Sequence, residues 1–236
     1  MTGRRMTVLV VILAMWPLSA LAQKTPDDAP QPPAVQSTPP PNEDPRLAAA
    51  RIIEEGGNST ATFFQNTTPT GGPATITHRR SGLTCVFEVQ PPRGQLTIYP
   101  SPTPQLLGDD VSCTMFNPAG RGFLETLYAT RYPTGDLAEH FAGAVGEIRA
   151  RFGAAEPWVP QVDQSVDPTL PPIRTARFRV IMDGVPSYTR MSIAQVGDWT
   201  VMLRFSTPIA DAEAGDRAAT AEIRRAVMQV RSATAR

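Results

Sequence analysis

Residues 174–206 have the sequence RTARFRVIMDGVPSYTRMSIAQVGDWTVMLRFS, and this stretch decides the fold. Apolar and polar residues alternate along three runs, which is typical of strands with one buried face. The runs are separated by Asp183-Gly184, which is a strong hairpin signal, and by Gly197-Asp198. The stretch therefore predicts a three-stranded antiparallel meander.

The register of this meander determines which side chains share a face. A two-residue turn at Asp183-Gly184 places Phe178 opposite Thr189. We expect a three-residue second turn at residues 196–198, because a two-residue turn would mix apolar and polar residues on one face. The predicted core face then consists of Ala176, Phe178, Val180, Thr189, Met191, Ile193, Trp199, Val201, Leu203 and Phe205.

The opposite face of the same meander is rich in arginine. Two rows form there: Arg177, Arg190 and Arg204, and then Arg179, Tyr188 and Ser206. Like charges on adjacent strands destabilise a sheet, so something should compensate them. Acids of a covering helix, such as Glu139 or Glu147, could pair with the arginines, or the arginines could point into water. Alternatively, the row binds a phosphate, sulfate or carboxylate, with Tyr188 as a further contact.

The rest of the chain predicts further strands and two long helices. Strands are expected at about 74–79, 83–89, 95–99, 111–116 and 123–131, after a polar loop around Phe63 and Phe64. A helix is expected over about 136–152 and another from Asp211 or Asp216 to Ser232, with a short helix capped by Asp44 near the start. The order strands–α–βββ–α predicts an α+β fold, a mainly antiparallel sheet with two packed helices. In element order alone it resembles the PsbP/Mog1-like α/β/α sandwich, and this implies no function.

The chain has two cysteines, Cys85 and Cys113. Each lies on a strand-like run and shares a face with apolar residues, as an inter-strand or inter-sheet disulfide should. A redox pair usually has the spacing Cys-x-x-Cys, and a zinc site needs more ligands than two cysteines and two distant histidines readily supply. We therefore expect a structural disulfide, which requires an oxidising compartment.

The first 22 residues have the features of a bacterial secretory signal peptide. Arg4 and Arg5 precede an apolar run of about thirteen residues, and small residues at positions 20 and 22 predict cleavage after Ala22, although an uncleaved anchor is the alternative. Residues 23–44 form a Pro-rich stretch typical of a disordered linker. The sequence thus predicts one α+β domain over 45–236, located in the periplasm or secreted, with no transmembrane segment after signal cleavage.

The composition and motifs favour a binding protein over an enzyme. Without Arg4 and Arg5, the chain has 20 basic and 22 acidic residues, which argues against nucleic-acid binding. We find no catalytic, metal or cofactor motif. The leading hypothesis is an envelope binding or accessory domain, which recognises an anionic ligand or a protein partner. The alternatives are a small hydrolase that uses His78 or His140, and a structural partner domain of an envelope assembly.

Overall fold

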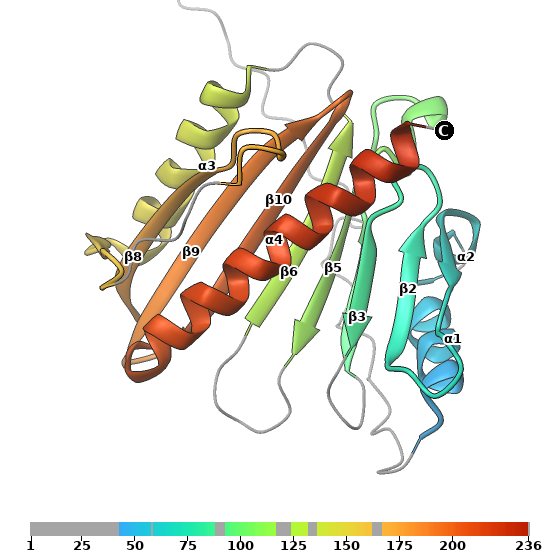
Figure 1. The fold of residues 1–236 in the computed structure, drawn as a ribbon, viewed down its shortest axis with the longest axis horizontal. Helices are drawn as coiled ribbons and strands as arrows, with labels where there is room; N and C mark the ends of the chain where they lie inside the picture. The colour runs from blue at the N-terminus through green and yellow to red at the C-terminus, as the bar shows by residue number, and fades with distance from the viewer. Residues whose placement is uncertain are drawn as a thin grey trace, which may run out of the picture. The chain divides into compact units, whose positions relative to one another are not determined.

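The computed structural model describes residues 43–57, 59–87, 93–116, 124–131, 136–161 and 167–235. All of them belong to one compact unit. The predicted signal peptide and nearly all of the predicted linker lie outside the described residues. The described fold is α+β with antiparallel sheets, as expected (Figure 1).

The larger sheet has seven antiparallel strands in the order β4-β5-β6-β10-β9-β8-β7. Their bounds are β4 Gly94–Ile98, β5 Asp110–Phe116, β6 Leu124–Arg131, β7 Glu156–Pro157, β8 Arg174–Met182, β9 Val185–Val196 and β10 Trp199–Pro208. The predicted meander is present as β8, β9 and β10, and β10 continues the sheet by pairing with β6. The meander therefore forms one side of the large sheet and is joined through β10 to strands β6, β5 and β4.

Two long helices lie on opposite faces of this sheet (Figure 1). Helix α3, Leu137–Phe152, packs against β8 and β9, and Asp136 caps its start by accepting a hydrogen bond from the Ala138 amide. Helix α4, Ala212–Thr234, crosses β9 and β10 on the other face. None of the described helices combines the length and the apolar character needed to cross a bilayer.

A smaller sheet of three strands lies between residues 64 and 87. It consists of β1 Phe64–Asn66, β2 Ala74–His78 and β3 Thr84–Phe87, preceded by α1 Pro45–Glu55 and α2 Thr60–Phe63. Helix α1 packs on β1 and β2, and Asp44 caps it as predicted. The expected polar loop around Phe63 and Phe64 is instead a helical turn followed by an edge strand, because both aromatic side chains are buried in the core.

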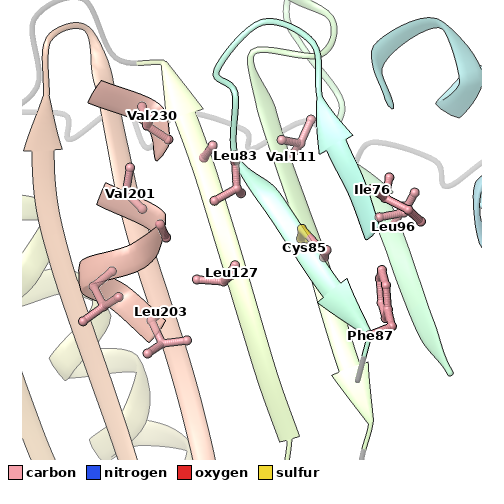
Figure 2. Close-up of a cluster of buried hydrophobic side chains, with 14 of the residues drawn as sticks. Ile76, Leu83, Cys85, Phe87, Leu96, Val111, Leu127, Val201, Leu203 and Val230 are labelled. Atoms are coloured by element: carbon pink, nitrogen blue, oxygen red, sulfur yellow. A yellow bond between two sulfur atoms is a disulfide. The ribbon is translucent and has the colours of Figure 1, made fainter. Parts of the chain in front are cut away.

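The small sheet and α4 pack on the same face of the large sheet and share one hydrophobic core (Figure 2). A disulfide joins Cys85 on β3 to Cys113 on β5, with the two Cα atoms 6.4 Å apart. The predicted structural disulfide is confirmed, and it links the two sheets. An internal disulfide fits an extracellular location.

The predicted register of the second hairpin is wrong. The turn at Gly197-Asp198 has two residues, and it pairs Ala194 with Val201. The predicted core residues are therefore divided. Those of β10 (Trp199, Val201, Leu203 and Phe205) pack with α4, whereas Phe178, Val180, Met191 and Ile193 of β8 and β9 pack with α3. The prediction assumed one buried face, but α3 and α4 bury both, so mixing the two sets costs little.

Candidate functional site

The observed register divides the predicted arginine row between the two faces of the sheet. Arg177 and Arg190 lie opposite each other on the α4 face, while Arg204 lies on the α3 face. Helix α4 brings Asp216 against the first two. Its Oδ1 accepts hydrogen bonds from Arg177 Nε at 2.7 Å, Arg190 Nη1 at 2.7 Å and the Tyr188 hydroxyl at 2.5 Å. One buried carboxylate thus compensates the two opposed guanidinium groups.

Arg190 is a core residue. Its side chain is 2% exposed, its Nη1 also donates to Thr220 Oγ1, and its Nε donates to Ser192 Oγ. Trp158 closes the outer side of the cluster, with its ring packed edge-on against Tyr188 at 4.8 Å. These contacts hold the Arg190 side chain inside the protein.

The charged groups of this cluster shift one another's pKa values. Burial raises the pKa of Asp216, but hydrogen bonds from Arg177 and Tyr188 and the charge of Arg190 outweigh it, so the pKa lies below its usual range. Burial lowers the pKa of Arg190, and the charge of Asp216 opposes this effect. Asp216 is therefore ionised at neutral pH, and the cluster is an internal ion network. We place no external ligand there.

The other two arginines of the predicted rows lie at more open positions. Arg179 is exposed on β8, in register with Glu156 of β7. Arg204 is partly exposed on the α3 face, where its Nη2 donates to Glu147 Oε2 at 2.5 Å. Glu147 is one of the two acids expected to pair with the row. The guanidinium of Arg204 lies 5.8 Å from the centre of the Tyr128 ring.

Arg204 contributes to a cavity of about 290 Å³ between α3 and the sheet. Its Nε is buried and has no hydrogen-bond partner among the described residues. A second cation, Arg151 of α3, lines the same cavity, with its guanidinium 5.3 Å from the ring of Phe152. Arg190 of β9 also contributes to the lining, although its guanidinium group is bonded to Asp216. The cavity therefore places the guanidinium groups of Arg204 and Arg151 beside one carboxylate, Glu147.

Hydroxyl groups complete this cavity, which we call the α3 cavity. Thr126 of β6 bonds to Thr114 of β5 at 3.1 Å, and Thr189 of β9 bonds to Ser206 of β10 at 2.9 Å. Hydroxyls can donate or accept, and guanidinium groups bind carboxylate, sulfate or phosphate oxygens in pairs. The α3 cavity is suited to a small anionic group.

A larger cavity of about 580 Å³ lies between the small sheet and the C-terminal half of α4. Two arginines line this cavity, and both form hydrogen bonds within the protein. Arg79 donates to the Gln65 side chain, and Arg225 donates to the Glu222 carboxylate and to the Thr84 carbonyl. Gln229, which lies on α4 like Arg225, accepts a hydrogen bond from the Thr84 amide. These contacts satisfy the exposed backbone of an edge strand, which is a structural role.

His78 is buried and belongs to the core. Its ring lies between Phe64 and Trp199, and its Nδ1 is 2.8 Å from Ser81 Oγ. Since the Ser81 amide also points at Nδ1, that nitrogen is the acceptor, and the proton is assigned to Nε2. Both side chains are fully buried, and the His78–Ser81 pair stabilises a turn. His78 also contributes to the lining of the cavity between the small sheet and α4.

The buried imidazole makes the protein sensitive to acid. Burial lowers the pKa of His78 to about 4, and the nearby backbone of Gly108 opposes part of this decrease. Among the described residues, Nε2 has no hydrogen bond of normal geometry. Protons then bind the unfolded chain better than the folded one. Stability is present above about pH 6.5, the usual histidine value, and is lost as the pH falls toward 4.

We expect the free energy of unfolding to fall by about 2 kcal/mol between pH 7 and pH 5 because of His78. Urea unfolding at several pH values measures this fall. His78→Asn should flatten the curve over this interval. A fall of the same size in His78→Asn would show that another group carries the pH dependence.

The described residues do not bring three His, Cys, Asp or Glu side chains together in a way that could hold a metal ion. Comparison with known proteins adds no function. No family model matches the chain, and no curated protein matches it. Among solved structures, CalU16 from Micromonospora echinospora is 15% identical, with 52% of this chain and 90% of that chain covered and a TM-score of 0.22. A similarity this low supports no argument about fold or function.

Proposed function

We propose that this protein is an exported, non-catalytic binding domain of the bacterial envelope that holds an anionic group in the α3 cavity. The predicted signal peptide of residues 1–22 would direct it to the periplasm or exterior, and residues 23–44 would act as a tether. The internal disulfide supports an oxidising location. The observation that carries the proposal is the position of Arg204, whose buried Nε has no hydrogen-bond partner in the described parts of the chain.

The ion pair between Arg204 and Glu147 supports this proposal. The Glu147 side chain is 67% exposed, so its carboxylate is held weakly and can be displaced at little cost. An incoming carboxylate or sulfate would take its place beside Arg204. Arg151 and the hydroxyls of the cavity would supply further hydrogen bonds. Glu147 thus marks the position that a ligand anion would occupy.

Thermal unfolding at low salt tests the proposal. Sulfate, phosphate or galacturonate should raise the unfolding midpoint of the wild-type protein, because a ligand that binds only the folded state stabilises it. Arg204→Met should lose this shift. Arg179→Met removes the same charge from an exposed position on another part of the sheet and should keep it.

Two results would contradict an anion site at Arg204. In the first, the shift persists in Arg204→Met. In the second, Arg179→Met reduces the shift as much as Arg204→Met does, which would indicate a general effect of net charge. Low salt is needed because screening weakens exposed charge interactions.

A further inference from the structure

Two tyrosines extend from the α3 cavity across the sheet. Tyr128 lies on β6, and Tyr99 directly follows β4; their ring centres are 6.4 Å apart, and their planes differ by 23°. Arg204 lies against the other side of Tyr128. These three residues, which we call the tyrosine stripe, form a continuous line from β4 to the cavity. Both rings are partly exposed, because α3 packs on β8 and β9.

Hydroxyl groups flank the tyrosine stripe. The Tyr99 hydroxyl lies 3.3 Å from Ser112 Oγ, and the Thr114–Thr126 pair lies one row further along the same face. Ser112 and Thr126 are buried beneath this surface, whereas Tyr99, Tyr128 and Thr114 are partly exposed. The surface therefore combines two aromatic rings with a few hydroxyl groups and ends in a cation. A sugar ring has the matching chemistry, since one face carries C–H groups that pack on an aromatic ring while its edge carries hydroxyls.

We propose that the ligand of this domain is an acidic carbohydrate chain. A uronic acid carboxylate would bind Arg204 in the α3 cavity, and the following sugar rings would pack on Tyr128 and Tyr99. Binding of the carboxylate in the α3 cavity rests on the proposed function. The tyrosine stripe adds the chemical class of the ligand.

The backbone beneath Tyr128 and Arg204 offers an extended peptide no strand with which to pair. Strands β5, β6 and β10 are paired on both sides, so their N–H and C=O groups are not available for strand addition. The flanking hydroxyls also distinguish the stripe from the contiguous apolar patch that a lipid chain would need. A chain of hydroxylated rings that carries carboxylates fits both the stripe and its charge.

Isothermal titration of the full chain with four probes tests this inference. The probes are hexagalacturonate, galacturonate, maltohexaose and sulfate. We expect hexagalacturonate to bind at least about tenfold more tightly than galacturonate, because only the longer chain reaches the tyrosines. Maltohexaose, which has the rings without the carboxylates, should bind much more weakly than hexagalacturonate.

Substitutions of Tyr99 separate the stripe from the cavity. Tyr99→Ala should weaken hexagalacturonate binding about five- to tenfold, the usual size of an aromatic contact, and should leave galacturonate binding unchanged. Tyr99→Phe keeps the ring and should retain the binding of both. Unfolding midpoints of the two variants confirm that each is folded at the temperature of the titration.

The outcomes distinguish the two proposals. Equal affinity for hexagalacturonate and galacturonate, with no effect of Tyr99→Ala, would overturn the carbohydrate inference and leave the anion site intact. Equal affinity for maltohexaose and hexagalacturonate would overturn the requirement for an acidic chain. If neither galacturonate nor sulfate binds, the anion site itself is wrong.

Discussion

Replacing Asp216 with alanine is expected to destabilise the folded protein by about 3 to 5 kcal/mol. The Asp216 side chain is fully buried and holds Arg177, Arg190 and Tyr188 together. Its removal leaves the buried guanidinium of Arg190 without its counter-charge, which is far more costly than the loss of an exposed pair. Urea unfolding followed by circular dichroism measures the change.

A matched control comes from the other face of the same sheet. Glu147→Ala removes the exposed carboxylate paired with Arg204 and should cost less than about 1 kcal/mol. Combining Asp216→Ala with Arg190→Met removes both charges of the buried pair and should cost less than the sum of the two single changes. A cost for Asp216→Ala no larger than that for Glu147→Ala would contradict an ion network in the core.

Replacing Cys85 and Cys113 together with alanine is expected to destabilise the protein by about 3 to 4 kcal/mol. The disulfide closes a loop with a sequence separation of 28 and joins β3 to β5 across the two sheets. Without it the unfolded chain gains conformational freedom, and the core between the sheets loses its covalent link. Chemical unfolding of the oxidised wild type and the double variant measures the difference.

Reducing agent supplies the control for this prediction. It should lower the stability of the wild type toward that of the double variant and leave the variant unchanged. A wild type that is equally stable in the oxidised and reduced forms would show that packing alone holds the two sheets together. The size of the effect also measures how strongly folding depends on an oxidising compartment.

The elements of this fold could be predicted because their signals are local. Alternation and the Asp183-Gly184 turn identified the meander, and the apolar spacing of its residues identified α3. The register of β10 could not be predicted in the same way. This register depends on α3 and α4, which bury opposite faces of the sheet. The alternation within the three strands carries no information about either helix.

The acid that compensates Arg177 and Arg190 could not be predicted from the strands alone either. Asp216 lies 26 residues after Arg190, and the sequence suggested it only as a start of the last helix. One signal was available: Asp216 lies one turn before Ala219 and Thr220, on the same buried stripe as Ile223. An acid at a core position of an amphipathic helix predicts a buried cationic partner, and the meander supplies two.

We propose that the arginines of this sheet have separate roles, with Arg190 internal and Arg204 available to a ligand. NMR spectra of the arginine Nε–H groups, recorded while galacturonate is added, test this claim most directly. Arg204→Met identifies one resonance by its loss. We predict that the Arg204 resonance moves in a saturable way while those of Arg177 and Arg190 stay fixed. Movement of Arg177 or Arg190 with a static Arg204 would contradict the account.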